Sequence, residues 1–122
     1  MTQLNEAQTK YLASQLLGRI ATAGPDGKAH VVPVGFRYNP ELGTIDAGGR
    51  RVASTKRWKD VKANPWAAIV IDDLVSMNPW VPRMLEIRGH AEAIDNGGEA
   101  FGPGFGGAFI RIYPEIVKSI GI

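Results

Sequence analysis

The sequence predicts a mainly β fold: an antiparallel barrel or sandwich of six or seven short strands with flanking helices. Two observations support this prediction. Candidate strands and turns alternate about every eight to twelve residues, a spacing typical of small barrels and sandwiches. Fifteen glycines and eight prolines among 122 residues suit short strands joined by tight turns. The length indicates one domain, residues 1–122, with a single hydrophobic core.

The first element is a predicted amphipathic helix over residues 5–17. Asn5 can cap this helix, Gln8 stands at the capping-box position, and Gly18 follows the last turn. Because residues three or four apart share a helix face, one face is apolar and should pack on the sheet. The members of this face are Leu4, Ala7, Tyr11, Leu12 and Leu16.

Seven segments of β-like sequence follow, separated by turns rich in glycine, proline, asparagine and aspartate. Pro33 is the unusual residue within them. Proline donates no hydrogen bond to a strand ladder, so Pro33 should lie at a sheet edge or a bulge. The predicted strands are residues 19–23, 29–38, 44–47, 66–72, 84–94, 108–113 and 115–120.

Four of the later regions carry further predictions. Residues 66–72 are almost continuously apolar, which favours burial of both faces of that strand. Residues 84–94 alternate between apolar and polar, so one face should be buried and the other solvated. Residues 73–82 are predicted to form a loop, and the glycine-rich residues 95–107 a mobile surface connection.

The cationic stretch, residues 50–62, is the most unusual part of the sequence. It holds six basic residues and one acid, a local net charge of +5 in a chain whose formal net charge is +2. The remainder of the chain therefore has a net charge of −3. Ser54 or Thr55 can cap a helix that runs to about Ala63, before Asn64-Pro65 stops it. The positive charge is thus concentrated at the start of a helix.

This placement favours a bound anion. Lys56 and Arg57 would lie in the first helical turn, where the helix dipole disfavours each cation by about 0.3–1 kcal/mol. A phosphate reverses the sign of this energy, and it accepts hydrogen bonds from backbone N–H groups, hydroxyls and cationic side chains. The alternative is a solvated basic surface that tolerates the cost. We favour a site for one phosphate group.

Several other chemistries find no support in the sequence. Because there is no cysteine, disulfides, thiolate metal sites and cysteine nucleophiles are excluded, which fits a reducing cytoplasm. No metal-ligand spacing or serine-hydrolase motif occurs. The run Gly102–Gly107 matches a dinucleotide-binding pattern by letters alone, since no buried strand precedes it and no helix follows.

We expect a cytoplasmic protein without a signal peptide, a bound metal, a nucleic-acid partner or a membrane partner. The first residues include no apolar run, and no segment approaches the length of a membrane span. The residues outside the cationic stretch carry a net negative charge, which disfavours a surface that binds nucleic acid. No side chain stands out as a general acid or base, so catalytic residues are unknown. Any chemistry should therefore reside in a bound cofactor.

Six motifs along the chain resemble those of one known superfamily. They are Leu17–Thr22 with Pro25–Gly27, Val32–Phe36, Arg51–Lys56 with Asp60–Pro65, Glu86–Ala91, Ile110–Glu115 and Ser119–Ile122. The superfamily comprises the split β-barrel flavin and deazaflavin oxidoreductases, which are pyridoxamine 5'-phosphate oxidase-like. The resemblance covers nearly the whole chain and is greatest to the branch that uses coenzyme F-420, a deazaflavin. It implies a split β-barrel.

The resemblance also implies a homodimer with two cofactor sites at the subunit interface. Val32, Pro33 and Val34 would line the deazaflavin ring. Trp80 and Arg83 would reach a cofactor, that of their own subunit or that of the partner; for Trp80 the alternative is an anchor in the dimer core. The residues that would hold the phosphate and the ribityl chain are Arg51, Val52, Ala53, Ser54, Thr55, Lys56 and Arg57.

The implied activity is that of an F-420-dependent reductase, which transfers a hydride from the reduced deazaflavin to an unsaturated small molecule. Two alternatives stay open. The protein could be an FMN-dependent oxidase or reductase of the same fold, since both cofactors end a ribityl chain in phosphate. It could also be a carrier that binds flavins or deazaflavins without catalysis. No set of residues indicates the substrate.

Overall fold

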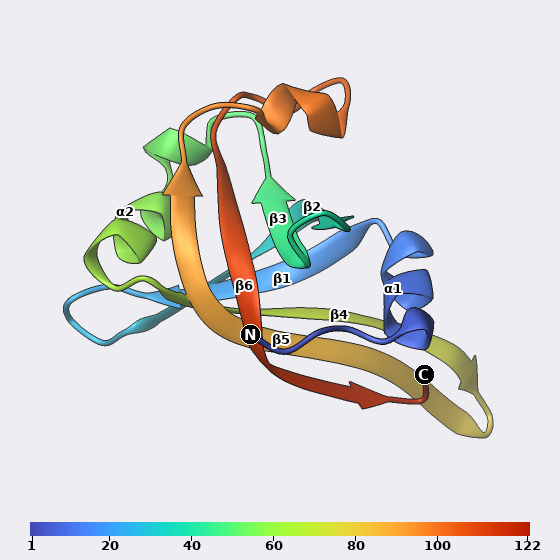
Figure 1. Cartoon of the computed structure of the whole chain (residues 1–122). Coiled ribbons are helices and arrows are strands. Elements are labelled where there is room, and N and C mark those ends of the chain that lie inside the picture. Colours follow the sequence, from blue (N-terminus) through green and yellow to red (C-terminus); the bar gives the residue numbers. More distant parts are fainter.

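A computed structural model describes residues 1–122 and confirms the predicted fold class. Six antiparallel strands close into a barrel in the order β1-β2-β3-β6-β5-β4 (Figure 1). The helices lie outside the closed sheet. The elements are α1 (Glu6–Ala13), β1 (Leu17–Ala23), β2 (Ala29–Asn39), β3 (Thr44–Gly48), η1 (Val52–Ser54), α2 (Lys56–Ala63), β4 (Trp66–Met77), β5 (Trp80–Ile94), η2 (Gly98–Phe101) and β6 (Phe109–Ile120).

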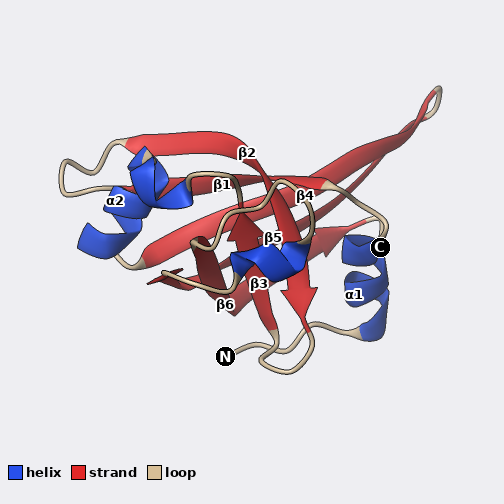
Figure 2. Ribbon diagram, turned by 90° about the horizontal axis from the view of Figure 1, so that it is seen from above, coloured by secondary structure: helices blue, strands red, loops and turns tan.

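Aliphatic side chains that point inward from the strands fill the barrel, because alternate residues of a strand face opposite sides. The α-helices lie at opposite ends of the barrel (Figures 1 and 2). Tyr11 and Leu12 of α1, and Trp58 and Val61 of α2, are buried in the same core. Eight inward side chains are at most 1 % exposed: Ile20, Ile45, Ile69, Ile71, Leu85, Ile87, Ile110 and Ile112. No helix combines the length and apolar composition that crossing a membrane requires.

Helix α1 begins where predicted and ends earlier. The Asn5 side chain accepts a hydrogen bond from the Gln8 N–H at 2.8 Å, and the Gln8 side chain accepts one from the Asn5 N–H at 2.9 Å. This confirms the capping box. The predicted end at Leu17 is wrong because Leu17 already pairs with Gly35 in the ladder of β1 and β2. Leu16, which was placed on the buried face, is 88 % exposed.

The predicted loop over residues 73–82 is instead a β-hairpin that extends past the barrel (Figure 1). The pairing of β4 with β5 continues out to Met77 and Trp80. Pro79 lies in the tight turn, and Pro82 lies beside a register shift in the ladder. Both are positions where a missing backbone N–H is tolerated, so the prolines do not end the strands.

Strand β6 is one strand rather than the two predicted on either side of Pro114. The ladder shifts register at this point: Gly89 pairs with Pro114, and Glu115 is the extra residue of a β-bulge. A Cβ on Gly89 would lie 1.8 Å from the carbonyl oxygen of Tyr113, so this close approach requires glycine. The proline therefore bends the strand without ending it.

Burial on both faces belongs to β3, not to the strand predicted at 66–72. Every residue of β3 is buried. In β4 burial alternates: Ile69 points into the barrel, whereas Trp66 is 41 % exposed. The outer face of β3 is covered because Gly48 lies against residues 95–107 and Asp46 forms an ion pair with Arg111 at 3.0 Å. Continuous apolarity in β4 thus reflects an exposed apolar outer face.

Candidate functional site

The cationic stretch follows β3, includes η1 and contains all of α2 except its last residue. Thr55 is the N-cap residue of α2, and its Oγ1 accepts a hydrogen bond from the Trp58 N–H at 3.3 Å. The same hydroxyl donates to the Val52 carbonyl oxygen at 2.6 Å. Of the two predicted capping residues, Thr55 is the one used. Ser54 is exposed beside it and is accessible to a ligand.

Arg57, in the first turn of α2, is a half-buried cation without an acidic partner. None of the six ion pairs in the structure includes it, and its buried Nε has no hydrogen-bond acceptor. Burial lowers the pKa of the guanidinium, as expected for a cation removed from water without compensation. A buried donor without a partner costs free energy, so an anion at this position would stabilise the protein.

Lys56 differs from its neighbour because an acid already compensates its charge. Its Nζ donates to both carboxylate oxygens of Asp60, at 2.9 and 3.1 Å, and the Thr22 hydroxyl donates to the same carboxylate at 2.8 Å. Burial alone would raise the pKa of Asp60, but the hydrogen bonds from Lys56 and Thr22 hold it below its usual value. Arg50 and Arg51 are exposed and form no ion pair.

The predicted ring wall, Val32 to Val34, lies on an unpaired edge of β2. Strand β3 pairs with β2 only from Gly35 to Asn39, so residues 29–34 pair with β1 alone. This confirms that Pro33 lies at an edge. Gly35 pairs with Gly48, after which the chain enters the cationic stretch. The free edge and the cationic stretch therefore begin at the same point. Val34 is buried, and Val32 and Pro33 are more exposed.

Within one chain, Trp80 and Arg83 are far from the cationic stretch. They belong to the β4–β5 hairpin, at the other end of the barrel from α2 (Figure 1). Trp80 is 67 % exposed near the hairpin tip. Arg83 donates two hydrogen bonds to Asp73, at 3.0 and 2.7 Å, and Asp73 also accepts one from the Tyr11 hydroxyl at 2.7 Å. These bonds, from Arg83 first and Tyr11 second, lower the pKa of Asp73.

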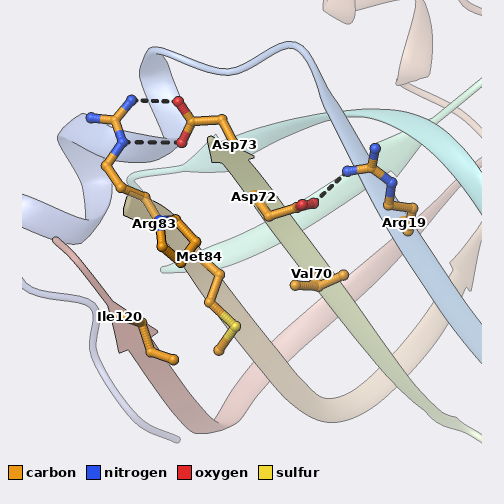
Figure 3. Close-up of a pocket in the computed structure, with 8 residues that line it drawn as sticks. Arg19, Val70, Asp72, Asp73, Arg83, Met84 and Ile120 are labelled. Carbon is orange, nitrogen blue, oxygen red and sulfur yellow. Dashed lines mark hydrogen bonds and ion pairs between the residues drawn. The ribbon is translucent and has the colours of Figure 1, made fainter. Parts of the chain in front are cut away.

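The largest cavity of the chain, about 540 Å³, lies on the outer face near this hairpin and not beside the cationic stretch (Figure 3). Its charged groups are already paired, Arg19 with Asp72 and Arg83 with Asp73. A site that uses both the cationic stretch and this cavity therefore needs more than one chain. Eight residues line the cavity: Arg19, Val70, Asp72, Asp73, Pro82, Arg83, Met84 and Ile120.

Sequence reasoning missed the cavity and also the aromatic residues of the 95–107 segment. The cavity was missed because its residues come from four strands whose pairing was only partly predicted. The only sequence signal for the segment was the pair Phe101 and Phe105 within a glycine-rich run. In the structure both rings lie on the barrel wall next to the start of the cationic stretch.

The comparison with known families decides how the chain is classified. The family model described as pyridoxamine 5'-phosphate oxidase matches residues 4–111. The chain belongs to the pyridoxamine 5'-phosphate oxidase family. The membership confirms the resemblance identified from the motifs of the sequence.

One relative in this family is named for its reaction. The 5a,11a-dehydrotetracycline/5a,11a-dehydrooxytetracycline reductase of Streptomyces rimosus is 36% identical over 117 residues, which cover 96% of this chain and 82% of the relative. Together with the family, it supports an oxidoreductase.

Two solved structures share the fold. The FAD binding protein from Mycobacterium smegmatis has a TM-score of 0.67 at 23% identity, covering 98% of this chain and 97% of that one. The heme storage protein HutZ from Vibrio cholerae has a TM-score of 0.68 at 15% identity, covering 98% and 94%. Since these proteins are named for different ligands, the fold alone does not determine the cofactor.

Proposed function

We propose that this protein is a coenzyme F-420-dependent reductase that reduces an unsaturated small molecule. The observation that carries the proposal is Arg57, a half-buried cation without a partner at the start of α2. A phosphate would give the guanidinium an acceptor, and the same helix start would supply backbone N–H groups. The family and the reductase relative support the oxidoreductase part of the proposal.

The residues present fit the phosphate end of such a cofactor. Gly49 has no side chain, and a Cβ there would lie 3.0 Å from Nη2 of Arg57. Arg51 and Ser54 are exposed next to this point, and the Lys56 side chain is 51 % exposed although it is paired with Asp60. The buried Val52, together with Ala53 and Thr55, would contribute mainly backbone groups.

The ring of the cofactor would lie along the free edge of β2 at residues 32–34. Backbone groups that β3 leaves unpaired there can hydrogen-bond to a flat heterocycle. When bound, the reduced deazaflavin supplies a hydride from its C5 to an electron-poor carbon of the acceptor, which also takes a proton from solvent. The chain contributes by holding ring and acceptor in register and by excluding water from them.

We infer that a second copy completes this site. The end of the hairpin is apolar and exposed, with Val75 at 56 %, Met77 at 76 % and Trp80 at 67 %, and Met77 pairs directly with Trp80. Contiguous exposed apolar groups of this kind mark interaction surfaces. In a homodimer formed through this face, Trp80 and Arg83 of one copy would lie near the cofactor of the other.

The acceptor we propose is an enone or a quinone. In both, carbonyl groups make a carbon–carbon double bond electron-poor. The name of the Streptomyces relative supports this class, because that protein is described as reducing dehydrotetracyclines. We extend only the chemical class to this chain, an unsaturated small molecule that accepts a hydride at an electron-poor carbon.

Titration of the purified protein with F-420 and with FMN, followed by fluorescence, tests the proposal. We expect F-420 to bind and its reduced form to be oxidised when an acceptor is added. Micromolar FMN binding without F-420 binding would replace the deazaflavin by FMN. Stoichiometric F-420 binding, without oxidation of the reduced form by quinones, enones or tetrapyrroles, would instead indicate a carrier.

A further inference from the structure

The segment 95–107 forms an aromatic wall next to the free edge of β2. A Cβ on Gly35 would lie 2.8 Å from Cζ of Phe105, and a Cβ on Gly48 would lie 2.7 Å from Cδ1 of the same ring. Phe101 approaches Gly48 in the same way, at 2.9 Å. Both rings therefore rest directly on backbone that glycine leaves bare, and a larger residue at either glycine would displace them.

This segment is also fixed to the start of the cationic stretch. The Gly106 N–H donates to the Gly49 carbonyl oxygen at 2.8 Å, and a Cβ on Gly106 would lie 2.3 Å from the Arg50 carbonyl oxygen. The Gly98 N–H donates to the Gly107 carbonyl oxygen at 2.8 Å, which closes the segment on itself. The aromatic rings are thus held at a set position between the proposed ring wall and the proposed phosphate site.

The two rings differ in how they are held. Phe101 packs against Phe109, with ring centroids 5.3 Å apart, and the Arg37 guanidinium lies 4.9 Å from the Phe101 centroid. Phe105 contacts only Phe101 among the aromatic residues, at 5.5 Å, and remains partly exposed. It also rests on Gly35, two residues from Pro33 and therefore on the same face of β2. Phe105 is thus the ring that a ligand at this edge would meet.

We propose that Phe105 is a specificity-determining residue for the acceptor and that Phe101 supports it. The inference rests on the proposed function, because it places the acceptor beside a ring bound at residues 32–34. Planar multi-ring acceptors would stack on Phe105 in an offset or edge-to-face arrangement, which favours them over small aliphatic rings. The site would accordingly select flat, conjugated carbonyl compounds.

The test compares two acceptors, menadione, a planar two-ring quinone, and cyclohex-2-enone, a single aliphatic ring. Each is measured with wild type, Phe105→Ala and Phe105→Tyr. The readouts are KM and kcat with reduced F-420, the Kd of menadione for the protein loaded with oxidised F-420 by calorimetry, and the Kd of F-420 itself. Thermal melts confirm that each variant is folded, and Phe105→Tyr keeps the aromatic ring should Phe105→Ala fail to fold.

For Phe105→Ala we expect KM and Kd for menadione to rise about three- to tenfold, the loss of one aromatic stacking contact. KM for cyclohex-2-enone and Kd for F-420 should change less than about twofold, and Phe105→Tyr should restore menadione binding. Equal changes for both acceptors, or no change for menadione, would overturn the role of Phe105 while leaving the proposed function intact. Failure of wild type to bind F-420 would overturn both.

Discussion

The arginines at the two ends of the barrel differ in whether they have an acidic partner. At the hairpin end Arg83 and Arg19 each have a carboxylate partner, Asp73 and Asp72. At the other end Arg57 is half-buried, and its Nε has no partner at all. Paired arginines stabilise the fold that holds them, whereas an unpaired buried arginine is stabilised only by an added anion. The contrast separates arginines that the fold already pairs with an acid from a half-buried arginine that an anion would stabilise.

The largest effect should come from Arg111, the most buried of the cations that form ion pairs. Asp46 is completely buried and accepts two hydrogen bonds from Arg111, at 3.0 and 3.1 Å. Asp46→Ala would leave the guanidinium without a partner and should lower the free energy of unfolding by about 3–5 kcal/mol. Urea denaturation measures this loss. As a control, Asp72→Ala removes an exposed partner and should cost at most about 1 kcal/mol. Equal losses would contradict the comparison.

The unpaired cation should give the opposite pattern. Arg57→Ala removes no ion pair, so the unfolding free energy of the protein without cofactor should stay the same or rise. Its affinity for F-420 should fall about ten- to a hundredfold, since a charge-assisted hydrogen bond contributes about 1.5–3 kcal/mol. Fluorescence titration measures the affinity. The matched control is Lys10→Ala on α1, which should leave it unchanged. If both variants bind F-420 alike, the phosphate site is wrong.

Lys56 should have an intermediate effect because Asp60 already compensates part of its charge. Lys56→Ala should weaken F-420 binding about two- to fivefold, more than Lys10→Ala and less than Arg57→Ala. The same titration ranks the three variants. An effect of Lys56→Ala larger than that of Arg57→Ala would show that the half-exposed lysine, rather than the half-buried arginine, is the main phosphate ligand.

The smallest expected effect is a pH dependence from Asp60. Its pKa is lower in the folded protein than in the unfolded chain, so its contribution to stability is present above pH about 4. That contribution is lost as the pH falls through the lowered folded pKa. Wild type should therefore lose more unfolding free energy than Asp60→Asn between pH 6 and pH 3, as measured by urea denaturation. Parallel losses in the two proteins would exclude this role.

Local patterns with a defined hydrogen-bond geometry could be predicted from the sequence. The capping box of Asn5 and Gln8 was predicted and is confirmed. Thr55 was one of two predicted N-caps, and an edge was one of two predicted positions for Pro33; the structure shows both. The alternation of β5 was also predicted, and Leu85 and Ile87 are buried as expected. These features depend on neighbours within a few residues or on a single missing N–H, so the sequence carries enough information.

Features that depend on distant contacts could not be predicted in this way. Pro79 and Pro114 suggested that the strands end at these residues. In the structure Pro79 lies in the hairpin turn and Pro114 lies beside a β-bulge, and both features depend on the pairing with another strand. The 95–107 segment looked like a mobile surface connection because the groups that fix it to the barrel, Gly35, Gly48 and Gly49, are far away in the sequence. The Lys56–Asp60 pair, by contrast, is an i,i+4 pair within α2 that the sequence contains. That Arg57 has no acidic partner depends on distant residues and could not be predicted. Whether the candidate residues hold a cofactor stays a prediction.

Arg57 lies on α2 and Trp80 on the β4–β5 hairpin, at opposite ends of the barrel, and this has a consequence for mixtures of subunits. In the proposed dimer each site takes its arginine from one copy and its tryptophan from the other. A dimer that combines an Arg57→Ala copy with a Trp80→Ala copy would then carry one site with both defects and one intact site. Mixing the two impaired proteins would then give more activity than either alone, an intragenic complementation that a site contained in one chain could not show.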